Sequence, residues 1–318
     1  MTSASMMKRK KRNSRMPFLP SYVALHENGL LRSIAEKLYE KSSPCTLCPH
    51  QCSADRPGGG KGKCRSGMLP IVSSFSPHFG EEAPLVGNNG SGTIFFTNCN
   101  LSCIFCQNYD ISHLGRGEEI SYRDLADMML FLQRKGCHNI NFVTPTHMIY
   151  AVVKALMIAV PGGLNIPLVY NSGGYDSVET LRIIEGVFDI YMPDFKYMDD
   201  AVAKELSGAG DYSENAAMAV KDMYRQTGDL LIERGIALRG LLVRHLVLPN
   251  NIAATDRVID FIASVSLNTY INIMDQYRPE YRAGECFDLK RRVTLKEYDD
   301  AVNYARKKGL RRIDGFTV

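Results

Sequence analysis

Apolar and polar positions along this chain predict short strands that alternate with helices. Six apolar runs are bounded by polar or glycine-containing turns, as expected for buried strands. These runs cover residues 93–97, 139–144, 166–171, 187–192, 241–248 and 270–274. Strands separated by helices favour a parallel sheet with right-handed crossovers. The chain is therefore predicted to be an α/β protein.

Between these runs, apolar residues recur at helical spacing. The predicted helices cover residues 21–40, 121–136, 147–160, 177–185, 201–206, 213–235, 253–265 and 295–308. Ser121 is placed to cap the second of them. Six strand–helix units are too few for a closed eight-stranded barrel, and a three-quarter barrel open on one side suits them. In barrels of this kind the active site lies at the carboxyl ends of the strands.

Length and composition indicate an ordinary globular protein. The chain has 318 residues, of which 45% are hydrophobic and 23% charged, which fits one large domain or one large and one small domain. No apolar run approaches the ~20 residues of a membrane helix. No apolar core follows the early basic residues, so we expect no secretory signal, no membrane partner and a cytoplasmic protein.

The basic charge of the chain is concentrated at its start. Residues 1–20 hold no acid and six basic residues, namely Lys8, Arg9, Lys10, Lys11, Arg12 and Arg15. Without these six, 32 basic residues face 34 acidic ones, a net charge of −2. A near-neutral body does not suggest a nucleic-acid partner. We expect residues 1–20 to be a disordered tail, serving as a localisation or organellar targeting signal or having no role.

Three cysteines follow the first predicted strand on one loop. Cys99, Cys103 and Cys106 are separated by three and by two residues. Three thiolates can hold three irons of a four-iron, four-sulfur cluster and leave the fourth iron open. A zinc site would need a fourth ligand, and the nearest histidine, His113, is not at ligand spacing. A disulfide would leave one thiol over.

This C-x3-C-x2-C spacing resembles the signature of the radical S-adenosylmethionine (radical SAM) superfamily. Phe105 matches the aromatic residue that often precedes the last cysteine there and contacts the adenine. The resemblance implies that SAM chelates the open iron and that one electron from the cluster cleaves its sulfonium. The resulting 5′-deoxyadenosyl radical abstracts a hydrogen atom. It also implies a partial TIM-like (β/α)6 barrel, here predicted over residues 76–318.

A second group of cysteines lies in residues 21–75, predicted to form a helix and a small Cys-rich metal-binding segment. Cys45, Cys48, Cys52 and Cys64 flank a turn with glycines at 58, 59, 60 and 62. Four thiols from two arms of a loop can make a closed four-thiolate site. We favour zinc or another structural site, with a second iron–sulfur cluster and unliganded thiols as alternatives. Cysteines without a secretion signal indicate a reducing compartment, where thiols more often bind metal than form disulfides.

Polar residues follow the second and third predicted strands. Thr144 and Thr146 stand where many radical SAM proteins carry a Gly-Gly-Glu motif that holds the SAM amino group. Their hydroxyls, or a carbonyl beside Pro145, could accept that hydrogen bond, or they could cap the next helix. Asn171 and Ser172 could bind a ribose or a carboxylate, with a helix-capping turn as the alternative.

Charged residues follow the fourth and fifth strands. Asp194 and Lys196 resemble the Asp-x-Lys of glycyl-radical activating enzymes, although a surface ion pair would look the same. Arg244, beside His245, lies in an apolar strand and needs a carboxylate partner. That partner could be the SAM carboxylate or an internal acid. After the sixth strand, residues 275–277 form a polar, substrate-facing edge.

These features together resemble the PflX-type group, relatives of the pyruvate formate-lyase activating enzyme. The resemblance rests on the second cysteine set, Cys106-Gln-Asn, Thr144-Pro-Thr-His and Asp194-Phe-Lys, and runs from about residue 20 onward. It implies an oxidoreductase that abstracts hydrogen from a protein or peptide and needs a reducing electron donor. Two alternatives are a radical SAM enzyme that modifies a small molecule or transfers sulfur or methyl, and a metal-stabilised binding module without activity. Cys137 and Cys286 have no partner at ligand spacing and are interpreted as core or incidental residues.

Overall fold

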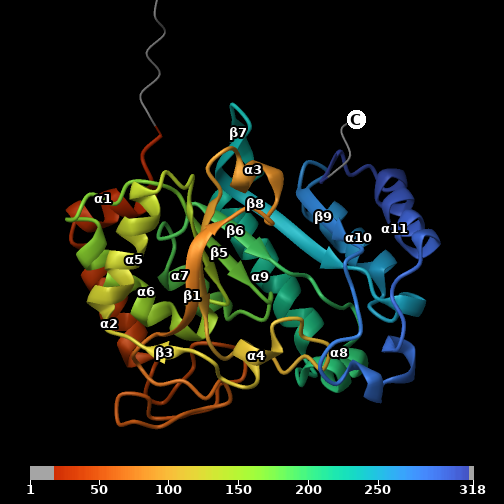
Figure 1. The fold of residues 1–318 in the computed structure, drawn as a ribbon, viewed down its shortest axis with the longest axis horizontal. Coiled ribbons are helices and arrows are strands. Elements are labelled where there is room, and N and C mark those ends of the chain that lie inside the picture. Colours follow the sequence, from red (N-terminus) through yellow and green to blue (C-terminus); the bar gives the residue numbers. More distant parts are fainter. Residues whose placement is uncertain (1–17, 315–318) are drawn as a thin grey trace, which may run out of the picture.

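The fold is built on one mostly parallel sheet (Figure 1). The computed structural model describes residues 18–314. Six strands pair in parallel in the order β9-β8-β6-β5-β4-β2. They are β2 (Ser91–Phe96), β4 (Ile140–Val143), β5 (Leu168–Ser172), β6 (Ile190–Pro193), β8 (Ile236–Leu246) and β9 (Tyr270–Met274). All six predicted strands are present, and the α/β fold with a mostly parallel sheet is confirmed.

Four further strands of the described chain extend the sheet in ways that the sequence pattern did not indicate. β1 (Ile71–His78) pairs antiparallel with β2, and a register shift between Val72 and Ser74 interrupts its alternation. Three further strands lie at the margins: β3 (Glu118–Glu119), β7 (Leu231–Glu233) and β10 (Arg312–Ile313). The single helix predicted for 213–235 is wrong. α9 (Tyr212–Thr227) stops at Gly228, which takes a φ of 70°, and the chain turns into the β7–β8 hairpin.

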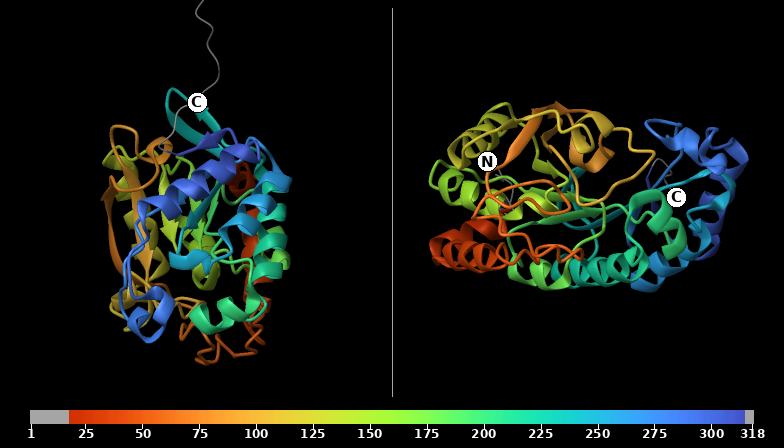
Figure 2. Two further views of the ribbon diagram at one scale, coloured as in Figure 1. Left: turned by 90° about the vertical axis from the view of Figure 1, so that its right-hand side faces the viewer. Right: turned by 90° about the horizontal axis from the view of Figure 1, so that it is seen from below.

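Helices cover the outer face of the sheet (Figures 1 and 2). Seven of them pack side by side in the order α5, α6, α2, α7, α9, α10 and α11. Their bounds are α5 (Tyr122–Arg134), α6 (Ile149–Ala159), α2 (Leu30–Glu40), α7 (Val178–Ile183), α10 (Thr255–Val265) and α11 (Leu295–Lys307). α2 therefore completes the helical layer from the start of the chain. The helix predicted for 21–40 is two helices, because Gly29 at a φ of 73° separates α1 (Ser21–Glu27) from α2.

Ser121 caps α5 as predicted, accepting a hydrogen bond from the Asp124 N–H at 3.1 Å. The remaining helices lie outside this layer of seven. They are α3 (Ala83–Val86), α4 (Tyr109–Ser112), α8 (Asp200–Ser207), η1 (Thr146–Met148), η2 (Pro249–Asn251), η3 (Ala283–Glu285) and η4 (Phe287–Leu289).

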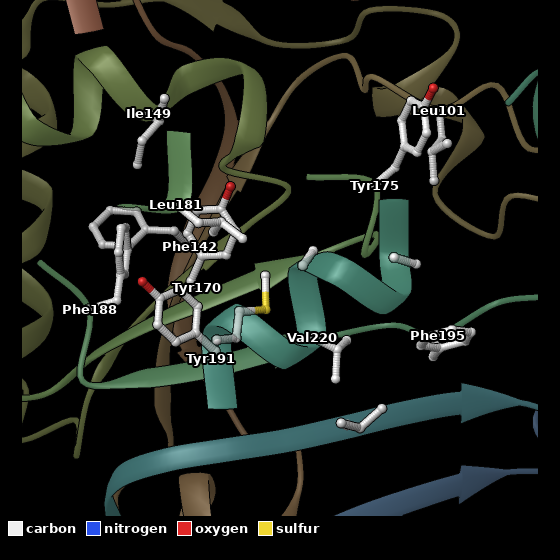
Figure 3. Packing of buried hydrophobic residues seen from close by; sticks show 14 of the residues in the cluster. Leu101, Phe142, Ile149, Tyr170, Tyr175, Leu181, Phe188, Tyr191, Phe195 and Val220 are labelled. Atoms are coloured by element: carbon white, nitrogen blue, oxygen red, sulfur yellow. The ribbon is translucent and has the colours of Figure 1, made fainter. Parts of the chain in front are cut away.

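Side chains alternate between the two faces of the strands, so the protein has two apolar clusters. The larger one lies between sheet and helices. It includes four aromatic rings in mutual contact, Phe142, Tyr170, Phe188 and Tyr191 (Figure 3). The smaller one fills the inside of the curved sheet. It contains Val169, Ile190, Met192 and Leu242, against which Leu85 of α3 packs. The strand interiors are thus a packed core, and open space is left near the strand ends.

Residues 41–70 form a long loop at the end of the molecule that also carries α4 and α8 (Figure 1). Their regular structure is limited to an isolated β-bridge between Ser42 and Cys45. No helix in the described residues is long and apolar enough to cross a membrane. The six basic tail residues lie outside the described part of the chain.

Candidate active site

The carboxyl-terminal ends of the parallel strands surround a pocket of about 250 Å³. Each of the six parallel strands, or the residue directly after it, contributes to the lining. In strand order along the chain these residues are Phe96, Thr144, Asn171, Asp194, Arg244 and Met274. A cavity of about 270 Å³ between α10 and α11 shares none of them. The structure therefore brings the polar strand ends singled out in the sequence to one place.

Three thiols line this pocket from the loop after β2. They belong to Cys99, Cys103 and Cys106. Burial raises the pKa of the Cys99 thiol, and the other two cysteines raise it further. Thiols that lie close together raise one another's pKa, because two neighbouring thiolates repel each other. A bound cationic centre removes this repulsion and takes the place of the thiol protons. Within residues 18–314, no three His, Cys, Asp or Glu side chains form a compact group for a single metal ion. In a multi-iron cluster, by contrast, each thiolate binds a different iron.

The cysteine loop is fixed from two sides by backbone hydrogen bonds. The N–H groups of Ser102 and Ile104 donate to the carbonyls of Ser207 and Leu206 at the end of α8, each at 2.9 Å. On the other side, the N–H of Arg282 donates to the Ile104 carbonyl at 2.8 Å. These bonds fix the positions of the cysteine Cα atoms without using their side chains. The loop geometry is thereby set by α8 and by the segment after β9.

Each of the three sulfurs has a hydrogen-bond partner. The Leu101 N–H donates to Cys99 Sγ at 3.3 Å, and the Ser207 hydroxyl donates to Cys103 Sγ at 3.0 Å. Cys106 Sγ lies 3.1 Å from the Ser112 hydroxyl. Hydrogen bonds to ligand sulfurs tune the electronic properties of a bound centre. Side chains outside the cysteine motif therefore belong to the site.

Two cations converge on the carboxylate of Asp194. Arg244 Nε donates to Oδ1 at 2.8 Å, and Lys196 Nζ donates to Oδ2 at 2.7 Å. Burial would raise the pKa of Asp194, but Arg244 and Lys196 outweigh it and hold the pKa below its usual value. Burial would lower the pKa of Lys196, but Asp194 and Cys103 raise it above its usual value. Asp194 and both cations are therefore charged in the pocket wall.

Arg244 is held by three protein groups. Besides Asp194, its Nη2 donates to Asn171 Oδ1 at 2.7 Å, and its Nη1 lies 3.5 Å from Glu81 Oε2. The sequence left two possible partners for Arg244, the SAM carboxylate and an internal acid. The structure contains the internal acid. Asp194 and Lys196, which could have been a surface pair, instead line the pocket. Lys196 presents its charge between Asp194 and the Cys103 sulfur.

Two of the predicted SAM contacts lie in the pocket wall. Phe105 is 6% exposed and packs edge-on against Tyr197 and Tyr277, which fixes its ring. Thr144 lies directly after β4 with a φ of 61°, a conformation that is strained for a β-branched residue. Such strain often marks a functional position. Both residues are placed to contact a ligand that enters the pocket.

Two other predicted SAM contacts, Thr146 and Ser172, instead donate hydrogen bonds to a buried acid. Asp176 is 1% exposed and accepts hydrogen bonds from Thr146 at 2.6 Å, Ser172 at 2.6 Å and Tyr170 at 2.9 Å. Three hydroxyl donors satisfy a carboxyl that burial would otherwise leave unpaired. Ser172 still borders the pocket, whereas Thr146 does not line it. The hydroxyls of both residues serve the turn after β5.

Two residues of the site were not found from the sequence. Glu81 reaches Arg244 from the segment between β1 and α3, far away in the chain, and it carries no motif. Ser207 ends α8 and meets Cys103 because α8 packs under the cysteine loop. Gln276, in the predicted 275–277 edge, lines the pocket, and its carbonyl accepts a hydrogen bond from the Gln107 amide at 2.9 Å.

The second cysteine group also comes together in the structure. The sulfurs of Cys45 and Cys52 are hydrogen-bonded, and burial followed by the charges of the other three thiols raises the pKa of Cys48 to about 12. A Cβ added at Gly62 would lie 2.2 Å from Cys52 Sγ, so this turn needs glycine. The four thiols thus occupy one small region of the 41–70 loop.

This loop is attached to the cysteine loop of the pocket. His50 Nε2 donates to the Asn100 carbonyl at 2.7 Å. Arg65 donates to the carbonyls of Ser112 and His113, each at 2.7 Å. The guanidinium of Arg56 donates to the carbonyl of His147 at 2.7 Å. The second thiol group therefore lies on a segment that braces the first.

Fold and site together define a parallel α/β barrel protein with a three-cysteine loop at its strand-end pocket. The Radical SAM superfamily model matches residues 93–262, which include all three cysteines. An uncharacterized protein of Methanocaldococcus jannaschii is 32% identical over 298 residues, covering 91% of this chain and 81% of that protein. The chain belongs to the radical SAM superfamily.

Membership implies a [4Fe-4S] cluster and cleavage of SAM by radical chemistry. The matched range contains the cysteine triplet, whose thiols line the pocket. An enzyme is therefore favoured over a metal-stabilised binding module. The fold agrees with the partial barrel expected of this superfamily.

Proposed function

We propose that this protein is a radical SAM enzyme that abstracts a hydrogen atom from a protein or peptide, in the manner of glycyl-radical activating enzymes. The observation that carries this is the Asp194–Lys196 pair, an Asp-x-Lys at the end of β6 with both side chains in the pocket wall. The reaction needs a reducing electron donor and, as the substrate, a segment that reaches the strand-end pocket.

In this proposal Cys99, Cys103 and Cys106 hold the cluster. When bound, the cluster supplies the electron that cleaves SAM and so starts hydrogen abstraction. The protein contributes positioning: α8 and Arg282 fix the cysteine loop, and the packed aromatic residues beneath Phe105 exclude water from one wall. The donor set fits the cluster because the three thiols line one pocket and the thiolates of Cys103 and Cys106 would repel that of Cys99 unless a cationic centre lay between them.

We assign the SAM contacts to four residues of the pocket wall. Lys196 is the cation that we assign to the methionyl carboxylate. Its ammonium bonds to one oxygen of Asp194, whereas the guanidinium of Arg244 already contacts Asp194, Asn171 and Glu81. Thr144 and Asn171 offer polar groups at neighbouring strand ends, and Phe105 offers an aromatic face. Arg244 holds Asp194 and Asn171 in place. Ser172 and Thr146 support the wall through Asp176.

A second metal site at Cys45, Cys48, Cys52 and Cys64 is part of the proposal. Its support is the electrostatic coupling among the four thiols and the lack of helix or strand in residues 46–70. Zinc remains our preferred metal. Binding of one ion would require the four thiols to move closer together, because no three His, Cys, Asp or Glu side chains of the described residues form a compact group for a single metal ion. A second cluster would favour the alternative function, sulfur insertion into a small molecule. Metal analysis separates them, since one four-iron cluster gives about four irons per chain and two give about eight.

The test uses deuterium transfer. The reduced enzyme is incubated with SAM and an extract of fully deuterated cells of the source organism, divided by ultrafiltration into macromolecules and small molecules. Deuterium in 5′-deoxyadenosine from the macromolecular fraction alone is the expected result. Deuterium from the small-molecule fraction alone would overturn the protein substrate and favour the alternative. A protein with Cys99→Ala is the control and should yield no 5′-deoxyadenosine.

A further inference from the structure

Ser207 connects the pocket to a buried chain of hydroxyl groups. It is 1% exposed, and its Oγ lies 3.0 Å from Cys103 Sγ. On its other side, the hydroxyl of the fully buried Tyr197 lies 2.8 Å away. The two hydroxyls and the sulfur thus form a continuous hydrogen-bonded chain away from solvent. Neither hydroxyl has a role in the assignment of cluster ligands or SAM contacts.

The direction of this chain is fixed once Cys103 is a ligand. A ligating cysteine is a thiolate, which accepts hydrogen bonds and donates none. Ser207 must then donate its one proton to the sulfur. Its oxygen can in turn accept the proton of Tyr197, whose own hydroxyl is thereby satisfied. Each donor strengthens the next, because buried hydrogen bonds polarise one another.

We propose that Ser207, oriented by Tyr197, is a positioning residue that raises the reduction potential of the cluster held by Cys103. The inference rests on the proposed function, because it requires a cluster at the three cysteines. A proton donated to a ligand sulfur draws electron density from the centre and stabilises the reduced, more negative state. In a buried site this hydrogen bond is charge-assisted and poorly screened.

Cys103 differs from the other two cysteines in this respect. Cys99 accepts from a backbone N–H at a longer distance of 3.3 Å. Cys106 lies beside the Ser112 hydroxyl at a half-buried position, where water can replace it. The negative charge that reduction adds to the cluster is therefore best compensated at Cys103.

The side chain of Ser207 can be changed without releasing the loop. The hydrogen bonds that fix the loop use the carbonyls of Ser207 and Leu206, not the hydroxyl. Ser207→Ala keeps these carbonyls and removes the hydroxyl alone. Ser207→Thr keeps the hydroxyl. Tyr197→Phe keeps Ser207 and removes the donor behind it.

The experiment is a redox titration of the reconstituted protein, followed by the EPR signal of the reduced cluster. The titrant supplies one electron per cluster. For Ser207→Ala we expect the ratio of reduced to oxidised cluster at a fixed solution potential to fall about tenfold, which is about 59 mV for one electron. Tyr197→Phe should shift the ratio in the same direction by less. Ser207→Thr should match wild type, and Ser112→Ala, the matched control, should shift less than Ser207→Ala.

Two results would overturn the inference. One is an unchanged potential in Ser207→Ala at full iron content, and the other is an equal shift in Ser207→Thr. If Ser207→Ala does not retain its iron, the reduction potential of Tyr197→Phe is the test. An unchanged potential in Tyr197→Phe would then overturn the inference. A wild-type protein that binds no cluster at the three cysteines would instead contradict the proposed function.

Discussion

The guanidinium of Arg244 and the carboxylate of Asp194 form a mostly buried ion pair at the ends of two neighbouring strands. Arg244 Nε donates to Asp194 Oδ1 at 2.8 Å, and the two residues also form a bridge between their strands. Their side chains are 17% and 19% exposed. The pair joins β8 to β6 and leaves the second oxygen of Asp194 to Lys196. Charge balance in the pocket thus depends on one carboxylate between two cations.

Replacing Arg244 should therefore destabilise the protein strongly. Arg244→Ala leaves Glu81 without this partner and Asp194 with Lys196 alone, and breaking a fully buried pair, the upper limit here, costs about 3–5 kcal/mol. Chemical denaturation of the apoprotein measures the loss. Lys296→Ala removes the exposed pair with Asp300 and is the control, with no measurable change expected. Equal effects of the two substitutions would show that the strand-end pair is not structurally important.

Lys196→Met should impair SAM binding more than folding. The ammonium is assigned to the SAM carboxylate, and loss of one hydrogen bond between charged groups weakens binding about tenfold or more. The expected result is a raised KM for SAM in 5′-deoxyadenosine formation, with cluster content unchanged. Lys204→Met, on the exposed face of α8, is the control. An unchanged KM in Lys196→Met would show that a residue other than Lys196 binds the SAM carboxylate.

His245 should make stability depend on pH below neutrality. Burial lowers its pKa from 6.5 to about 4, because the ring is fully enclosed. The ring is neutral in the fold, with Nδ1 donating to the Phe195 carbonyl at 2.6 Å and Nε2 accepting from Thr255 at 2.9 Å. The unfolded chain binds the proton more readily, so the free energy of unfolding should fall as pH drops from about 6.5 to about 4.

The measurement is urea denaturation across this pH range for wild type and His245→Asn. Asparagine can keep the bond to the Phe195 carbonyl and does not titrate. We expect the variant to be less stable at pH 7 and to show a shallower fall towards pH 4. Parallel pH profiles for the two proteins would mean that His245 does not carry this dependence.

Removing the metal that we propose for the second thiol group should open the 41–70 loop. The loop has a glycine-rich turn and no helix or strand beyond one bridge, so a metal cross-link would add to the hydrogen bonds of His50, Arg56 and Arg65 that hold it. Chelation, or Cys64→Ser, is expected to lower the metal content and to speed proteolysis near Gly58–Gly62. Cys286→Ser, outside both thiol groups, should change neither. Unchanged cleavage after complete metal removal would refute the cross-link.

The sequence predicted the parts of the fold that follow a simple period. Six parallel strands were found because buried strands are continuous apolar runs. β1 was missed because its register shift breaks the alternation, and β7 because helical residues precede it up to Gly228. The cysteine triplet was recognisable because its three ligands are local in the chain.

The remainder of the site depends on contacts between distant segments. Glu81 meets Arg244 from a loop more than 150 residues earlier in the chain, and Ser207 meets Cys103 across 104 residues. No local pattern encodes such pairs. The roles of Thr146 and Ser172 also required the structure, because their hydroxyls look available until Asp176 is placed between them.

The central claim is that three cysteines hold a cluster with an iron open to SAM. The most direct measurement is the EPR spectrum of the anaerobically reconstituted, reduced protein before and after SAM is added, for wild type and Cys103→Ala. We predict a cluster signal that changes shape with SAM in wild type and is lost in the variant. A wild-type signal that SAM leaves unchanged, or a protein that takes up zinc and gives no signal, would contradict the account.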